Sequence, residues 1–192
     1  MTVDCDNRGL SVAQQWLDAA NPTHPSLLDT QHRVAQLYNT RNVPAVFWID
    51  EERRIMRAND PIYAQRRNRE TGEVTIRNDY LNAVRDWVAH GPASVFVQQH
   101  DAMPALYVPT PADALAQAHF RLATFLEQQG HGEEAVAHFK QAHDLRPENW
   151  NYRRQAYSLV DAQAHYGTTM AEVMRDPSSP PFYPPFELPT PP

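Results

Sequence analysis

The most strand-like stretch of the chain reads Asn42-Val43-Pro44-Ala45-Val46-Phe47-Trp48-Ile49-Asp50. Residues 45–49 place apolar side chains on both faces of a strand, as the central strand of a helix-covered sheet does. The polar residues 50–53 and the short run 54–57 after them predict a hairpin into an antiparallel neighbour. The sequence therefore predicts a buried strand in an α/β fold whose sheet is mixed in strand direction.

Amphipathic helices are predicted on both sides of this strand along the chain. Upstream, Val12, Trp16 and Leu17 repeat at helical spacing. A second helix is expected to follow Asp29, because a carboxylate at that position can cap the first turn. Downstream, the apolar residues between positions 80 and 88 predict a further helix. This alternation of helices and strands indicates an α/β module in the first half of the chain.

The order of these elements resembles the thioredoxin superfamily, in particular its redoxin branch of thiol-disulfide oxidoreductases. The resemblance rests on Leu28-Asp29, a helix ending in Leu37-Tyr38-Asn39, the stretch 42–50, the hairpin and the closing helix. It implies that the peptide bond before Pro44 is cis and lies at a redox centre, since an X-Pro bond adopts that isomer at small cost. Proline alone predicts the trans isomer, so the cis bond is an expectation from the resemblance.

The redoxin family has a further strand upstream and a helix led by a Cys-x-x-Cys pair, whereas this chain has one cysteine, Cys5. Asp4 and Asp6 flank Cys5, and their charges would raise the pKa of its thiol and oppose nucleophilic attack. We therefore expect Cys5 to be structural, with no catalytic residue and no cofactor. Two interpretations stay open: a relative without redox activity, or a protein whose active-site segment lies upstream of this chain.

A second pattern, from Ala116 to Asn149, resembles a tetratricopeptide repeat (TPR) of about 34 residues. Small residues would let its two helices approach closely, while Leu122, Leu126 and Phe139 would fill the seam between them. His119 and Leu126 stand where the repeat pattern favours Trp and Tyr. The positions that match the pattern are Leu122, Ala123, Gly130 at the turn, Ala135, Phe139, Ala142 and Pro147.

A single TPR-type repeat is visible, and a lone repeat cannot bury both of its faces. A third helix that begins at Trp150 is expected to cover one face with Tyr152, Ala156 and Leu159. The α/β module is a candidate cover for the other face. The helical region is then either a structural appendage or part of a peptide-binding groove, since such grooves usually need several stacked repeats.

Charge and composition narrow the classes of function. The formal net charge of −6 and a pI near 5.8 oppose sequence-independent nucleic-acid binding, which depends on Lys and Arg. No window approaches the roughly 20 apolar residues of a membrane-spanning helix, and the first ten residues lack the basic and apolar regions of a signal peptide. We therefore expect no nucleic-acid partner, no membrane span and a cytoplasmic location, the last only if Met1 is the natural start.

The nine histidines suggest metal binding, but His119, His131, His138 and His143 show no ligand spacing typical of a metal site. We therefore expect solvated or core histidines and no metal.

The Pro-rich residues 177–186 cannot propagate a helix. They are expected to pack back onto the protein through their aromatic side chains, with a partner's aromatic groove as the alternative.

The sequence thus predicts a partial thioredoxin-like mixed sheet with flanking helices, followed by an all-α TPR-like hairpin and a capping helix. Two functions are compatible with it. The first is a non-catalytic protein-interaction scaffold that binds a protein partner or forms a homodimer. The alternative is a fragment or divergent member of a thiol-disulfide oxidoreductase family whose Cys-x-x-Cys lies upstream. The expected segments are a thioredoxin-like domain at 1–92, a linker at 93–110, a TPR-like region at 111–166 and a Pro-rich tail at 167–192.

Overall fold

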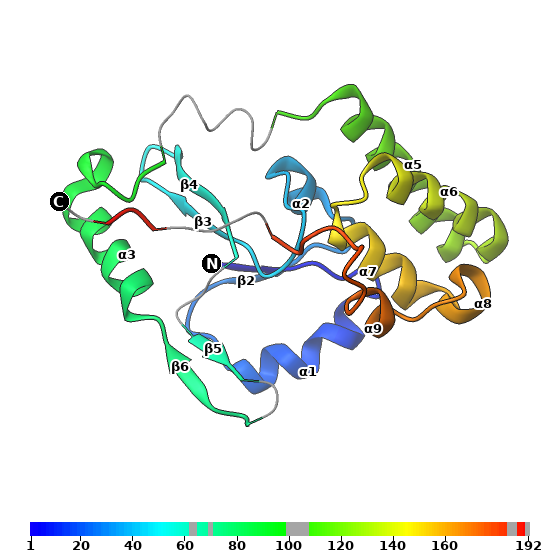
Figure 1. Ribbon diagram of the computed structural model, residues 1–192, viewed down its shortest axis with the longest axis horizontal. Helices are drawn as coiled ribbons and strands as arrows, with labels where there is room; N and C mark the ends of the chain where they lie inside the picture. The colour runs from blue at the N-terminus through cyan, green and yellow to red at the C-terminus, as the bar shows by residue number, and fades with distance from the viewer. Residues whose placement is uncertain (62–64, 69–70, 99–107, 184–187, 191–192) are drawn as a thin grey trace. The chain divides into compact units, whose positions relative to one another are not determined.

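The computed structural model describes residues 1–61, 65–68, 71–98, 108–183 and 188–190 as a mixed α/β structure with small sheets (Figure 1). Contacts along the chain divide it into two compact units. Unit 1 combines Met1–Arg41 with Pro109–Phe182, and unit 2 combines Asn42–Val108 with Tyr183–Pro192. Each unit therefore combines parts of more than one of the consecutive segments expected from the sequence. Parts of the expected linker and tail lie outside the described residues.

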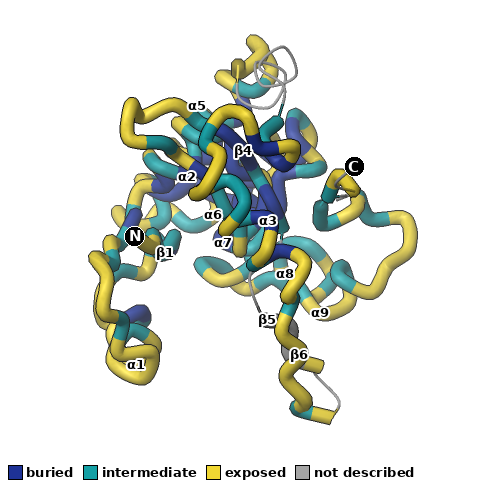
Figure 2. Tube along the Cα trace, turned by 90° about the vertical axis from the view of Figure 1, so that its left-hand side faces the viewer, coloured by how far each residue is buried: buried dark blue, intermediate teal, exposed yellow. Residues whose placement is uncertain are grey.

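The N-terminal part of unit 1 is a β-α-β arrangement. Strand β1 (Thr2–Asp4) pairs in parallel with β2 (Ser26–Leu28), and helix α1 (Leu10–Ala20) connects them. Parallel neighbours need such a crossover, which a tight turn cannot supply. In Figure 2 most of α1 has the colour of exposed residues. The apolar periodicity of α1 is therefore present, but its apolar side is largely uncovered in this unit.

Helix α2 (Arg33–Leu37) is shorter than the sequence indicates. His32 precedes it in the left-handed region, with φ 52°, so the helix cannot extend back toward Asp29. The Asp29 carboxylate accepts hydrogen bonds from the backbone N–H groups of Arg33, Val34 and Ala35, the first three residues of α2, at 2.8, 2.7 and 3.2 Å. The expected capping role of Asp29 is confirmed, and the expected length of the helix is wrong.

The second part of unit 1 is helical. Helices α5 (Pro111–Gln128) and α6 (Gly132–Leu145) form a hairpin, which α7 (Trp150–Leu159), α8 (Ala162–Tyr166) and α9 (Met170–Val173) follow. Gly130 ends the first helix with φ 83°, a conformation that glycine adopts without strain. Thr110 and Asp113 form a reciprocal capping box at the start of α5. The sequence predicted a helix beginning at Trp150, directly after the hairpin, and α7 confirms it.

The hairpin core consists of small residues between aromatic rings. Alanines at the crossing let α5 and α6 approach closely, and aromatic side chains from α5, α6 and α7 fill the space around them. The expectation that Leu122 fills the seam between the two helices is wrong. Leu122 lies outside the core and is 42 % exposed, because it sits one helical step of about 100° from Ala123. The buried members are Ala116, Phe120, Ala123, Ala135, Phe139, Ala142, Tyr152 and Ala156.

The start of the C-terminal tail packs on helix α7. The ring of Phe182 stacks on Trp150 with centroids 4.2 Å apart, and Trp150 Nε1 donates a hydrogen bond to the carbonyl of Pro181 at 3.3 Å. The expectation that the tail packs back is confirmed for Phe182. Phe186, which was expected to take part, lies outside the described residues.

Unit 2 contains two β-hairpins and one long helix. Strands β3 (Val46–Ile49) and β4 (Ile55–Asp60) are antiparallel, as are β5 (Gln65–Arg67) and β6 (Val74–Ile76), and helix α3 (Asn78–His90) ends in a short turn of 3-10 helix at Gly91–Ala93. The expected hairpin after the strand is confirmed.

The expectation that strand β3 is buried on both faces is wrong. Trp48 is buried against Tyr80 and Trp87 of helix α3, whereas Ile49 is exposed and the strand's other residues are half-buried. The described residues hold three two-stranded sheets with no ladder joining them, so one continuous mixed sheet remains a prediction.

Among the described residues, no helix combines the length and the apolar character that crossing a bilayer requires. The cytoplasmic location expected from the sequence stays a prediction.

Candidate functional site

The outer side of helix α5 carries an exposed apolar surface. Leu115, Leu122 and Phe125 are 51, 42 and 56 % exposed. They lie on one side of the helix, since residues three, four and seven apart share a face. Phe120, on the opposite side, and Ala123, about 100° around the helix from Leu122, are buried in the hairpin core. We call this surface the α5 face; its residues are Pro111, Ala114, Leu115, Ala118, Leu122 and Phe125, all exposed.

The α5 face is apolar apart from the exposed Arg121, which lies between Ala118 and Phe125 on the same side of the helix, and the size of its side chains varies along the helix. Its N-terminal half offers Pro111, Ala114 and Ala118 beside one large side chain, Leu115, and its C-terminal half ends in the bulky Leu122 and Phe125. Scattered apolar residues on a surface need no explanation, but a contiguous apolar surface marks an interaction site. The arrangement can therefore bind another apolar helix surface.

Arg146 connects the hairpin to the N-terminal part of unit 1. Its side chain is buried, and Nε lies 2.9 Å from carboxylate oxygens of both Asp113 and Glu148. Nη1 donates to Asn39 Oδ1 at 2.8 Å. The guanidinium therefore joins the start of α5, the turn after α6 and the segment after α2, which holds the helix that bears the α5 face in place.

Cys5 lies just after strand β1 and is half-buried. Burial, together with the negative charges of Asp29 and Asp4, raises the pKa of its thiol to about 12. Asp6, expected to contribute, is instead paired with Arg8, whose Nη2 lies 2.6 Å from a carboxylate oxygen of Asp6. At neutral pH the thiol stays protonated, so this environment disfavours nucleophilic attack by Cys5.

Pro44 and Cys5 belong to different units. The bond between Val43 and Pro44 is cis, the isomer implied by the resemblance, and the hydroxyl of Tyr183 donates to the carbonyl of Pro44 at 3.0 Å.

Of the positions taken from the repeat pattern, Ala123, Ala135, Phe139 and Ala142 meet in the hairpin core. Gly130 and Pro147 lie in the turns at the ends of the helices.

Unit 2 has a buried polar network that the sequence did not predict. Arg57 Nε donates to both carboxylate oxygens of Asp60 at 2.9 and 2.7 Å, and the hydroxyl of Tyr80 donates to the same carboxylate at 3.0 Å. Trp48 Nε1 donates to Tyr80 Oη at 2.9 Å. Burial raises the pKa of Asp60, although the Arg57 side chain opposes that shift. The network ties α3 to the β3–β4 hairpin, a structural role.

Two histidines that are 19 positions apart meet across the helical hairpin. His119 on α5 and His138 on α6 are half-buried, and their Nδ1 atoms lie 2.9 Å apart. Spacing rules within one helix cannot detect such a pair. Among the described residues, no three or more His, Cys, Asp or Glu side chains form a metal-binding group.

Comparison with known proteins gives no assignment. No protein-family model matches the chain, and no curated protein and no solved structure matches it. The case for a function therefore rests on the geometry of the units themselves.

Proposed function

We propose that the chain is a non-catalytic protein-interaction scaffold in which a thioredoxin-like α/β portion is joined to one TPR-like repeat. The observation that carries this proposal is the α5 face, with its three large apolar side chains exposed on a helix whose other side is buried. A repeat of this kind stacks on a neighbour to bury its remaining face. The α5 face is the surface that such a neighbour would cover.

The neighbour that fits best is a second copy of the chain. In an antiparallel pair of α5 helices, Leu122 and Phe125 of one copy would lie against the small Pro111 and Ala114 of the other, and the reverse. Such a two-fold interface uses the same surface on both partners.

The test is the mass of the protein in solution by sedimentation velocity. At about 0.1 mM, a range in which weak dimers form, we expect the wild-type protein to be largely dimeric. Leu122→Glu and Phe125→Glu place a charge in the interface and should give monomers with unchanged circular dichroism. Leu37→Glu, at another exposed apolar position of unit 1, serves as the control and should stay dimeric.

A wild-type protein that is monomeric under these conditions, or a Leu122→Glu variant that remains dimeric, would contradict the proposal.

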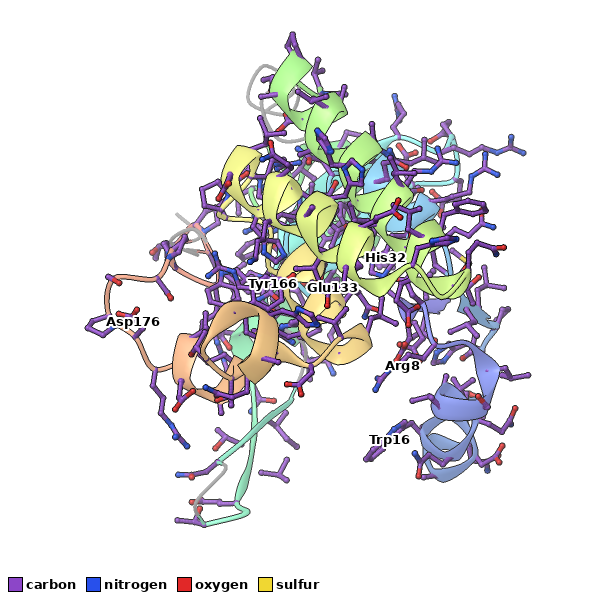
Figure 3. All side chains as sticks on the ribbon, turned by 90° about the vertical axis from the view of Figure 1, so that its right-hand side faces the viewer. Arg8, Trp16, His32, Glu133, Tyr166 and Asp176 are labelled. Carbon is purple, nitrogen blue, oxygen red and sulfur yellow. The ribbon has the colours of Figure 1, made fainter. Side chains whose placement is uncertain are left out.

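A second candidate is a member of the thiol-disulfide oxidoreductase family with its Cys-x-x-Cys upstream of this chain. Trp16 favours it: this side chain of α1 is 69 % exposed, and in Figure 3 it projects into open space. An additional strand and helix beside β1 and α1 would cover it. The intact mass of the protein from its native source tests this candidate. A mass above that of the 192 residues supports it, and an equal mass contradicts it.

A further inference from the structure

His119 and His138 face each other from two different helices. Their Nδ1 atoms are 2.9 Å apart, their ring centroids 5.1 Å apart, and their ring planes are inclined by 31°. Both side chains are half-buried, so solvent reaches the pair. The contact brings two imidazole nitrogens, the commonest metal-binding groups of proteins, to one point on the hairpin.

The hairpin core fixes the backbone positions of the pair. The residue after each histidine is a phenylalanine, Phe120 or Phe139, and both are buried in the core. The two phenylalanine rings have centroids 5.9 Å apart. Separating the histidine backbones would therefore require opening the α5–α6 packing, whereas each half-buried imidazole can turn about its own side-chain bonds. A site whose ligands stand on rigid helices is preorganised for binding.

A hydrogen bond between two Nδ1 atoms requires a proton on one of them and a lone pair on the other. If the donor ring carries its proton on Nε2 instead, both Nδ1 lone pairs become free. This change of tautomer leaves both rings neutral and releases no proton. Neutral imidazole with a free lone pair is the form that binds metal ions.

We propose that His119 and His138 form a two-histidine site for Ni²⁺ or Cu²⁺, with water completing the coordination. Two nitrogens 2.9 Å apart, each roughly 2.0–2.1 Å from an ion, subtend about 90° at that ion. This is the angle between neighbouring ligands in the tetragonal geometry that Cu²⁺ and Ni²⁺ adopt with nitrogen and oxygen ligands. Tetrahedral Zn²⁺ would need the two nitrogens about 3.3–3.4 Å apart.

The test is the melting temperature of the full chain with and without NiCl₂ at pH 7.5. An ion that bridges α5 and α6 binds the folded state preferentially, so the melting temperature of the wild-type protein should rise by several degrees. His119→Ala and His138→Ala should each lose this rise, measured against their own metal-free values. His131→Ala is the matched control, because His131 is an exposed histidine of the same hairpin, and it should keep the rise.

Calorimetric titration with NiCl₂ provides a second readout that does not depend on the stability of the variants. Loss of either histidine of the pair should weaken Ni²⁺ binding at least tenfold, and loss of His131 should leave it unchanged. A wild-type protein without a metal-dependent rise overturns the proposal. Retention of the rise or of the affinity in both His119→Ala and His138→Ala also overturns it.

Discussion

At the scale of single residues, burial shifts the pKa values of His143 and Cys5 more than neighbouring charges or hydrogen bonds do. Burial lowers the pKa of His143 to about 4, even though a hydrogen bond to the backbone of Tyr152 favours its charged form. Its Nε2 has no hydrogen-bond partner among the described residues. The sequence predicted Cys5 to have a raised pKa from its acidic neighbours. The direction agrees, but burial is the largest cause. Sequence shows which charges are adjacent along the chain, and only the fold shows which groups lose water.

His143 should make the stability of unit 1 depend on pH. The unfolded chain protonates this histidine near its usual pKa of 6.5, whereas the folded protein does so near 4. Its contribution is therefore fully present above about pH 6.5 and is lost progressively as the pH falls toward 4, by about 3 kcal/mol at most. Urea unfolding at pH 7.0 and pH 4.5 measures the difference. The wild-type protein should lose more stability than His143→Gln, and equal losses would contradict the assignment.

At the scale of elements, the sequence located most helices but not the side that each one buries. The helical hairpin, the helix after it and the β3–β4 hairpin all lie where their patterns predicted them. The periodicity of α5 did not distinguish Leu122 from its neighbour Ala123, because a pattern cannot show which face a second helix covers. Helix α2 was predicted too long, since nothing in the local sequence marks His32 for a left-handed conformation. Both errors arise because tertiary contacts, which a local pattern does not show, decide which side of a helix is buried and where the helix begins.

Helix α2 should depend on the Asp29 carboxylate. Five residues are too few for a helix to be stable by itself, and Asp29 satisfies three of its N-terminal N–H groups. Asp29→Ala should cost about 1–2 kcal/mol and speed hydrogen exchange at the amides of residues 33–35. Asp29→Asn keeps an acceptor oxygen, so its loss should be smaller. Equal exchange rates in the wild-type protein and Asp29→Ala would show that α2 is held by other contacts.

At the scale of the whole molecule, unit 1 combines two segments that are far apart in the sequence. Besides the contacts of Arg146, the backbone N–H of Trp150 donates to the carbonyl of Arg41 at 2.7 Å, and Asn151 Nδ2 donates to the carbonyl of Thr40 at 2.7 Å. The sequence suggested consecutive segments because periodicity and composition are local properties. Contacts between residues more than 100 positions apart cannot be inferred from them.

Arg146 should be the side chain on which this junction depends most. Arg146→Met leaves the carboxylates of Asp113 and Glu148 without their cation, and because both carboxylates are partly exposed, the loss should be about 1–3 kcal/mol. Arg175→Met, at an exposed arginine of the same unit, should change stability by less than about 0.5 kcal/mol. Guanidinium unfolding curves of the two variants measure the contrast. Similar midpoints would show that the junction does not rely on Arg146.

The same junction affects how the protein is made. A ribosome releases residues 1–41 long before it releases the helices on which they pack, since residues 42–108 are synthesised in between. During that interval residues 1–41 lack the helix that pairs with Thr40 and Arg41, and at roughly 5–20 residues per second the delay lasts several seconds. Translation speed through the middle of the chain therefore governs how long this nascent segment is open to aggregation or chaperone capture.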